Sequence, residues 1–570
     1  MLLAQVVQTS AAVAATRSRL AKRDLLAATL RAAGPEEVAV VAEFLAGRPR
    51  QRRTGVGWRS LTDLPTPARA ETLTPLGVDA ELARIGALTG PGSQATRATA
   101  VRALFATATA PEQQFLAGLL LGELRQGALD SLLLDAIAAA AEVPLAAVRR
   151  AAMFSALSGP IAQAALTGGA QALTGFHLVV GRPVRPMLAS AAPDVDAALA
   201  KITGAAGATA VADGGLADGG PMADGGTANG GPADGGPVAD GAPPADDGGH
   251  DRPAAAAVAV DGKIDGIRIQ VHRAGEQVTV FTRSLDDVTD RLPEVVDTVR
   301  DLAVNAVVLD GEAIALDAEG RPRAFQETGS RTMTRDAATA GAEVPLTAYF
   351  FDLLHLDGRD LLDAPASERF AALADVVPPS ARVPRRVTAD PAQVQDFFAE
   401  MLGRGHEGVV VKDLTAPYAA GRRGAAWVKV KPRHTLDLVV LAVEWGSGRR
   451  RGLLSNIHLG ARDGEGFVML GKTFKGMTDE MLAWQTERFL ALETGREGHV
   501  VHVRPEQVVE VAFDGVQRSS RYPGGVALRF ARVLRYRHDK SPTEADTLSI
   551  IRAYLPTTST DNFNGSNSAP

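Results

Sequence analysis

The 570-residue sequence contains no cysteine. Disulfide bonds, cysteine-based zinc sites and thiol nucleophiles are therefore excluded. The sequence also lacks an apolar run long enough to cross a bilayer, which takes about 20 residues. The apolar beginning of the chain has no basic stretch typical of a secretory signal. We therefore expect a cytoplasmic protein without a membrane span.

The chain also has no excess of positive charge, since its formal net charge is -6. Residues 201–260 hold eight Asp, no Glu, one Lys and one Arg, so this segment carries the whole net charge. The rest of the chain is neutral, and local basic clusters decide whether a polyanion can bind. The length predicts about three or four domains.

Residues 1–180 have alanine and leucine at helical spacing, in segments broken by short turns. A basic, glycine-containing loop interrupts this pattern and holds Arg50, Arg52 and Arg53. Guanidinium groups in such a loop are suited to phosphates, although a solvated loop between helices explains it equally well.

Residues 204–256 form a low-complexity segment in which Ala-Asp-Gly-Gly recurs. A calcium-binding β-roll is disfavoured, because the spacing drifts and the bulky strand residue is missing. We predict a flexible acidic linker, since nothing in this composition can form a core.

Downstream, short alternating runs indicate an α+β domain with antiparallel strands up to about residue 431, followed by a small all-β barrel with a helix at 477–492. Arg449, Arg450 and Arg451 lie in a glycine-rich turn of this barrel, where a phosphate-tracking loop and a solvated loop are both plausible. The polar residues 557–570 are expected to fray.

Lys263 stands directly ahead of an alternating strand at 267–271. A lysine attacks only as the free amine, which desolvation or neighbouring positive charge from Arg268 and other cations would favour. Asp265 is placed to orient that amine, and Gly266 to let a ligand approach the backbone. Taken alone, Lys-x-Asp-Gly is also typical of a surface turn.

Other segments add matching chemistry. The strand at 307–312 ends in Asp310 and Glu312, as at a site for a ribose hydroxyl or a metal. Lys429 and Lys431 alternate along a strand and emerge on one face. Burying two cations on an inward face costs free energy unless an anion such as a polyphosphate lies between them.

In this order, the segments resemble the motif set of ATP-dependent DNA ligases, within the covalent nucleotidyltransferase superfamily. Segment 263–266 resembles the nucleophile motif. The other matching segments are 122–127, 182–188, 281–284, 309–312, 349–352, 407–412, 427–431, 529–532 and 537–540. The resemblance thus covers nearly the whole chain.

The resemblance implies a multi-domain protein: an all-α DNA-binding domain at 1–180, an α+β nucleotidyltransferase (adenylation) domain with antiparallel sheets at 181–431, and a C-terminal OB-fold β-barrel at 432–556. The linker is then an insert in the second domain. The implied partner is nicked double-stranded DNA, which a monomer would encircle. No interaction with a membrane is implied. The implied roles are replication, repair or recombination near the nucleoid.

The implied substrate is ATP with Mg²⁺. Lys263 would carry AMP, assisted by Asp265 and Lys431. Phe351 would stack on adenine, unless it is a core residue. Glu312 would hold the ribose or a metal and Glu407 a metal, with structural ion pairs as the alternative. The residues implied to contact the phosphates of ATP are Arg268, Arg283, Lys429, Lys431, Arg532, Arg537 and Lys540. The last three lie on the barrel, which would have to close over the nucleotide and later swing away.

Two departures from the family pattern are the linker insert and Gly262, which stands where a larger side chain is usual. They put the packing of the first strand in doubt. The alternatives are an RNA ligase, a capping-type nucleotidyltransferase or a non-catalytic DNA clamp. NAD-dependent ligation is disfavoured, because the zinc site of that family needs cysteine.

Overall fold

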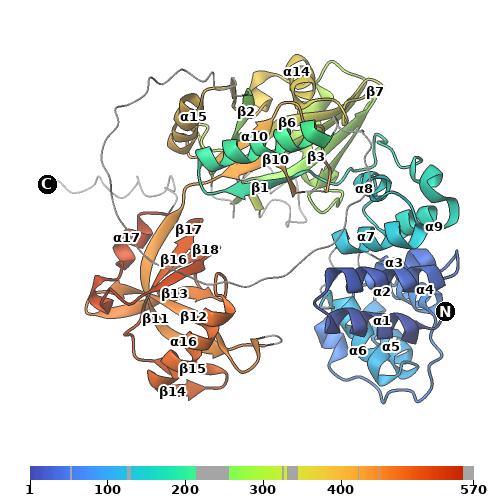
Figure 1. Ribbon diagram of the computed structural model, residues 1–570, viewed down its shortest axis with the longest axis horizontal. Coiled ribbons are helices and arrows are strands. Elements are labelled where there is room, and N and C mark those ends of the chain that lie inside the picture. Colours follow the sequence, from blue (N-terminus) through green and yellow to red (C-terminus); the bar gives the residue numbers. More distant parts are fainter. Residues whose placement is uncertain are drawn as a thin grey trace, which may run out of the picture.

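The computed structural model describes residues 1–51, 54–124, 130–212, 256–323, 327–329, 344–421, 423–447 and 450–555. The protein has three lobes (Figure 1). A helical lobe and a β-barrel lobe lie on opposite sides below a central lobe built of sheets and helices. None of the helices within these ranges is long and apolar enough to span a membrane.

The helical lobe is formed by the N-terminal elements. They are α1 (Leu3–Ala15), α2 (Arg19–Ala32), α3 (Val38–Leu45), η1 (Trp58–Leu61), α4 (Pro75–Gly86), α5 (Ser93–Ala106), α6 (Ala110–Leu121), α7 (Asp130–Ala141), α8 (Leu145–Met153) and α9 (Gly159–Leu173). Their apolar faces share one core, which includes Phe44, Phe105 and Ile137. Helix α6 begins at a Thr109–Glu112 capping box, which satisfies free backbone N–H groups.

The central lobe contains two five-stranded sheets, with orders β1-β10-β9-β2-β8 and β4-β3-β5-β6-β7. Every strand pair is antiparallel except β1 with β10. The strands are β1 (Leu188–Ala192), β2 (Val258–Lys263), β3 (Ile267–Ala274), β4 (Gln277–Thr282), β5 (Ala306–Ala315), β6 (Leu346–Leu356), β7 (Arg359–Asp360), β8 (Arg385–Thr388), β9 (Gly408–Asp413) and β10 (Arg423–Val430). The helical elements are α10 (Val195–Ala212), η2 (Thr289–Arg291), α11 (Pro293–Arg300), α14 (Ala366–Val376), η3 (Pro379–Ala381) and α15 (Pro391–Gly403).

The linker predicted from residue 204 begins later, because α10 continues as a helix to Ala212. The alanine-rich composition before the first Asp-Gly-Gly favours this extension. The remainder of the predicted linker, residues 213–255, lies outside the described residues.

The first strand is firmly packed despite Gly262. A Cβ at this position would lie 2.8 Å from the sulfur of Met401, so the methionine fills the space that a larger side chain would take. Strand β2 also pairs on both sides, with β8 and β9. The departure from the family pattern therefore leaves no gap beneath Lys263.

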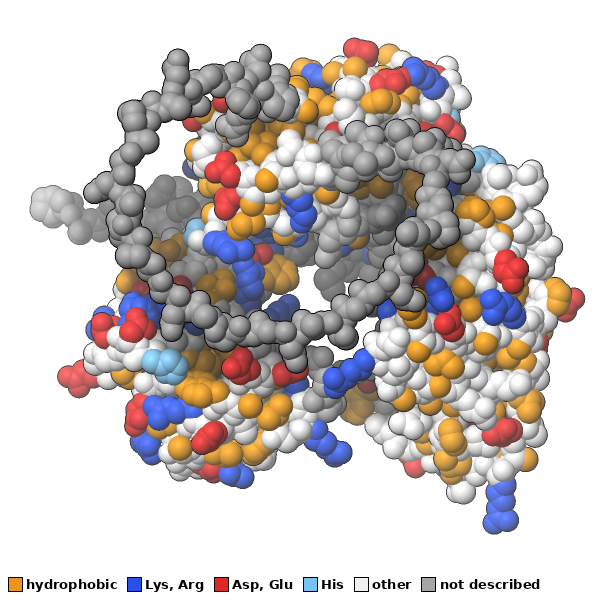
Figure 2. All heavy atoms as spheres, in the orientation of Figure 1, with side chains coloured by type: hydrophobic (Ala, Val, Ile, Leu, Met, Phe, Trp, Pro, Cys, Tyr) orange, Lys and Arg blue, Asp and Glu red, His pale blue; other side chains and the backbone are white. Residues whose placement is uncertain are grey.

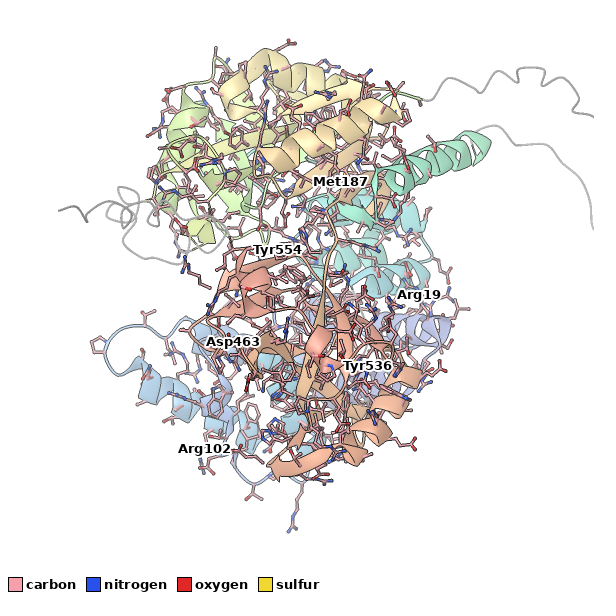
Figure 3. All side chains as sticks on the ribbon, turned by 90° about the vertical axis from the view of Figure 1, so that its left-hand side faces the viewer. Arg19, Arg102, Met187, Asp463, Tyr536 and Tyr554 are labelled. Atoms are coloured by element: carbon pink, nitrogen blue, oxygen red, sulfur yellow. The ribbon has the colours of Figure 1, made fainter. Side chains whose placement is uncertain are left out.

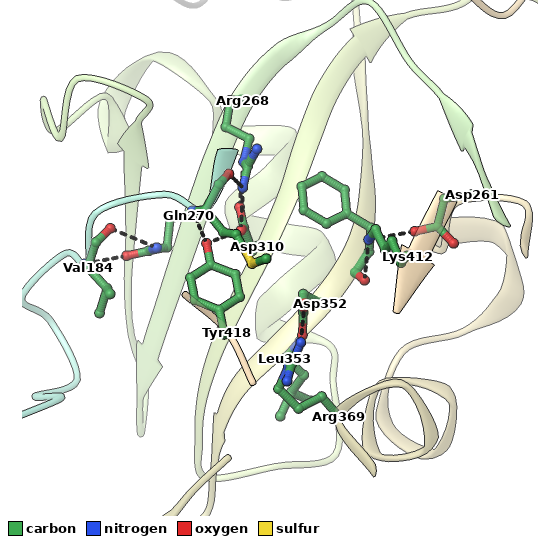
Figure 4. A network of polar contacts seen from close by, with 12 residues as sticks. Val184, Asp261, Arg268, Gln270, Asp310, Asp352, Leu353, Arg369, Lys412 and Tyr418 are labelled. Atoms are coloured by element: carbon green, nitrogen blue, oxygen red, sulfur yellow. Dashed lines mark hydrogen bonds and ion pairs between the residues drawn. The ribbon is translucent and has the colours of Figure 1, made fainter. Parts of the chain in front are cut away.

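The segment that enters the central lobe is held against β3. The side chain of Gln270 accepts from the N–H of Val184 at 2.7 Å and donates to its carbonyl at 3.1 Å (Figure 4). The backbone N–H of Met187 donates to the Tyr418 hydroxyl at 2.9 Å. Figure 3 shows Met187 at this entry, above the labelled residues of the barrel.

The third lobe is a barrel whose main path runs β13-β12-β11-β15-β14, with β16 pairing β11 and β19. Its elements are β11 (His434–Trp445), β12 (Leu454–Asp463), β13 (Gly466–Thr473), α16 (Asp479–Ala491), β14 (Glu493–Glu497), β15 (Val500–Val503), β16 (Val508–Phe513), β17 (Gly515–Arg518), β18 (Val526–Arg529), β19 (Arg532–Arg537), η5 (Pro542–Glu544) and α17 (Leu548–Arg552). Helix α16 is tied to β19, since the Tyr536 hydroxyl donates to Gln485 at 2.7 Å. The predicted three-part fold class is confirmed.

Candidate active site

Two adjacent cavities share part of their lining: the inner one lies within the central lobe, and the outer one lies between the central lobe and the barrel. The inner one has a volume of about 180 Å³ and the outer one about 1480 Å³. Lys263, Arg268, Arg283, Glu312 and Lys429 line both of them. Residues from distant parts of the sequence therefore meet at one place, as the motif order predicts.

The amine of Lys263 is mostly buried and lies 2.5 Å from the carboxylate of Glu407. The pairing of Lys263 with Gly408 across β2 and β9 brings Glu407 beside it. Burial lowers the pKa of Lys263, but Glu407 and Glu312 outweigh it and raise the pKa above its usual value. The two carboxylates thus act on the pKa of Lys263 in the direction opposite to that expected of neighbouring cations.

Two carboxylates flank this amine. Glu407 contacts both Lys263 and Lys431, and these cations hold the pKa of Glu407 below its usual value despite burial. Glu312 accepts from the N–H of Gly266 at 3.1 Å, and its burial raises its pKa to about 7. Gly266 is needed here for close packing on β5, since a Cβ would lie 2.6 Å from the carbonyl oxygen of Ala313, and Gly266 also lines the outer cavity.

The two carboxylates fit a Mg²⁺ ion that is shared with a substrate. Among the described residues, no group of three or more His, Asp or Glu side chains could hold a metal on its own. Mg²⁺ in nucleotide sites is typically bound by one or two carboxylates together with substrate phosphates and water. Glu312 and Glu407 supply that number of carboxylates beside the lysine.

The inner cavity has an aromatic wall. Phe351 faces it and packs edge to face on Trp427, with ring centroids 5.8 Å apart. Phe350 points the other way and is fully buried in the core of the second sheet. The alternation of β6 thus presents one phenylalanine to the cavity and one to the core.

Arg268 is held differently from the prediction. Its guanidinium makes two hydrogen bonds to Asp310, at 2.7 and 2.6 Å, and lies 4.8 Å from the ring centroid of Phe351 (Figure 4). The Tyr418 hydroxyl donates to the same carboxylate at 2.5 Å. A guanidinium engaged in this way forms part of the cavity wall, and its charge is already balanced by a carboxylate.

Sequence reasoning missed the polar floor of the inner cavity. Asp261 lies 2.6 Å from the buried amine of Lys412 (Figure 4). Asp261 also accepts two hydrogen bonds from Arg385. Burial lowers the pKa of Lys412 to about 8. The two-residue period of β2 puts Asp261 on the face of Lys263, and that signal was available in the sequence.

The barrel contributes to the outer cavity through Lys475, Asp514, Arg529 and Arg532. Arg529 donates to Asp265 at 2.8 Å, so Asp265 is paired with the barrel and not with the Lys263 amine as expected. Figure 2 shows Lys and Arg side chains gathered where the barrel meets the central lobe.

Arg537 and Lys540, both predicted near the nucleotide, are absent from the lining of these two cavities. Both pair with Asp437 on β11, and Arg537 also pairs with Asp539. In this orientation, therefore, the barrel presents a different face to the central lobe.

Family models match three consecutive parts of the chain. They are the DNA ligase N terminus at residues 59–138, the ATP dependent DNA ligase domain at 186–431 and the ATP dependent DNA ligase C terminal region at 450–540. A protein of Beutenbergia cavernae named "Probable DNA ligase" is 59% identical over 558 residues, which cover 97% of this chain and 99% of that relative. The chain belongs to the ATP-dependent DNA ligase family.

Further relatives agree with this membership. A "Probable DNA ligase" of Mycobacterium marinum is 53% identical over 97% of this ligase and 100% of its own length. A solved structure named "Pmar-Lig_Pre." covers 94% of this ligase and 99% of that chain, with a TM-score of 0.56 and 15% identity. At this identity the structure supports the three-lobed fold.

The arginines predicted to contact DNA differ in their partners and in their exposure. Arg50 forms a two-point ion pair with Asp79, which ties its loop to α4. Arg450 donates to the carbonyl of Phe474 at 2.8 Å, and Arg451 is exposed. Arg52, Arg53 and Arg449 lie outside the described residues.

Proposed function

We propose that this ligase seals nicks in duplex DNA with ATP, through a lysyl-AMP intermediate on Lys263. The observation that carries the proposal is the convergence of a buried lysine, two carboxylates and further cations on one cavity with an aromatic wall. Phosphoryl transfer depends on positioning and charge neutralisation, and this set of groups is suited to both.

In the first step, the Lys263 nitrogen forms a bond to the α-phosphorus of ATP and the bond to the pyrophosphate oxygen breaks. The side chain starts as an ammonium and releases two protons to the solvent on the way to the phosphoramidate. Glu312 and Glu407 would hold Mg²⁺, which when bound neutralises phosphate charge and offsets the carboxylates that raise the pKa of Lys263. Arg283, Lys429 and Lys431 would bind the phosphates, and Phe351 would stack on adenine.

In the next steps, a 5'-phosphate oxygen of the nick attacks the phosphorus of the lysyl-AMP and frees the lysine. The 3'-hydroxyl then loses its proton, forms the new phosphodiester bond and displaces AMP. We propose that a single chain surrounds the duplex, with the helical lobe and the barrel lobe on opposite sides below the central lobe (Figure 1). Sedimentation with a nicked duplex should give one chain per nick.

The substrate class is tested by offering nicked DNA and nicked RNA with ATP, NAD or GTP. We expect sealing of DNA with ATP alone. Protein labelled from GTP would indicate a capping-type enzyme, and preferred sealing of RNA an RNA ligase. A protein that binds nicked DNA but is never labelled would be a non-catalytic clamp.

The distal barrel cations should matter only for the first step. We expect Arg537→Ala with Lys540→Ala to slow adenylation of the protein by about tenfold or more, because both would have to reach the pyrophosphate. Sealing of a nick that already carries AMP should stay near the original rate, since both side chains lie away from the cavity here. Labelling kinetics and gel-based sealing measure the two steps.

Arg535→Ala is the matched control, because this arginine lies on the same strand but pairs with Glu510. It should affect neither step. An equal loss of both steps in the double variant would contradict a role confined to adenylation.

A further inference from the structure

Asp514 joins the two lobes at the mouth of the outer cavity. It follows β16 directly, and its carboxylate lies 3.6 Å from the amine of Lys431 on the central lobe. The other carboxylate oxygen lies 3.5 Å from Arg532 on the barrel. Its backbone N–H donates to the carbonyl of Arg529 at 3.0 Å. One side chain thus holds two cations that line the same cavity.

The position of Asp514 depends on how the barrel is turned. Strand β16 pairs with β11 over residues 508–513, and Phe513 lies opposite His434 at the beginning of β11. Only residues 432 and 433 separate Lys431 from that strand. If the barrel turns about these two residues, β11 and β16 move together and carry Asp514 away from Lys431.

The charged residues of the barrel fall into two groups, which differ in whether they line the cavity. In the present orientation Asp514, Arg529 and Arg532 line it, while Arg537 and Lys540 are paired with Asp437 elsewhere. An orientation that delivers Arg537 and Lys540 to a pyrophosphate therefore removes Asp514. If adenylation uses Arg537 and Lys540 in this way, the contact between Asp514 and Lys431 would belong to the steps on DNA.

We propose that Asp514 is a positioning residue for the steps on DNA and not for adenylation of Lys263. This inference rests on the proposed ligase function and adds a residue to it. By bridging Lys431 and Arg532, Asp514 fixes two cations where the phosphates of a nick would arrive. They would stabilise the charge that develops when the 3'-oxygen bonds to the 5'-phosphorus and AMP departs.

The test uses the full-length protein with Asp514→Asn, which keeps the shape and removes the charge. Two rates are measured: formation of labelled protein from ATP, and sealing of a nick that already carries AMP. We expect labelling within about twofold of the original protein and sealing slower by about tenfold to a hundredfold. Asp514→Glu should recover part of the sealing rate, because it restores the carboxylate.

Glu510→Gln is the matched control, since this acidic residue lies on β16, the strand that Asp514 follows, and pairs with Arg535 outside the cavity lining. It should leave both rates unchanged. Equal slowing of both steps by Asp514→Asn, or sealing at the original rate, would overturn the inference. Labelling by the variant shows that it is folded, and failure of the original protein to label or seal would instead overturn the ligase function itself.

Discussion

Lys263→Ala should abolish covalent labelling by α-labelled ATP, with a loss of more than about a thousandfold in rate. The alanine has no nitrogen to attack the α-phosphorus. The reason is the position of Lys263 at the end of β2, where its amine pairs with Glu407 and interacts with Glu312. The measurement is label that stays on the denatured protein after incubation with Mg²⁺ and ATP.

Lys201→Ala is the control, because Lys201 lies on α10 with an exposed side chain outside the cavities. Its labelling should equal that of the original protein. Lys263→Ala should still seal a nick that carries AMP at a measurable rate, since the final step needs no new bond to the lysine. Label retained on the Lys263→Ala variant would place the nucleophile elsewhere.

Arg369→Met should destabilise the central lobe by about 3–5 kcal/mol. Arg369 and Asp352 form an ion pair in which neither side chain is exposed, with the guanidinium 2.8 Å from the carboxylate (Figure 4). Arg369 also donates to the carbonyl oxygens of Ala364 and Ala416. Methionine would leave the buried carboxylate without its cation, and denaturant unfolding measures the loss.

Arg359→Met is the matched control, since Arg359 pairs with Glu368 on the surface of the same lobe. It should hardly change stability, because exposed ion pairs contribute little. The double variant Arg369→Met with Asp352→Leu replaces both buried partners. It should lower the free energy of unfolding by less than Arg369→Met alone. Unfolding of Arg369→Met at the same denaturant concentration as the original protein would show that the buried pair is unimportant.

The sequence predicts the cavity residues well because strand periodicity is local. Alternation in β6 and β10 is enough to direct Phe351, Lys429 and Trp427 to one side. The order of the motifs adds which strands must meet. The fold class and the convergence on Lys263 follow from these two signals.

The partners of the charged groups could not be predicted in the same way. Glu407 lies beside Lys263 because of the register between β2 and β9, which neither strand encodes alone. Asp265 and Arg268 were assigned to the amine and to phosphates, but Arg529 and Asp310 are their partners. The orientation of the barrel depends on a two-residue connection, and local sequence does not specify it.

The contacts of β2 hold Lys263 in place independently of the length of the chain that precedes this strand. Neighbours on both sides hold β2, and Met401 fills the space beside Gly262. The stretch between α10 and β2 is therefore a place where a fluorophore or an affinity handle could be added to the catalytic lobe without displacing its nucleophile.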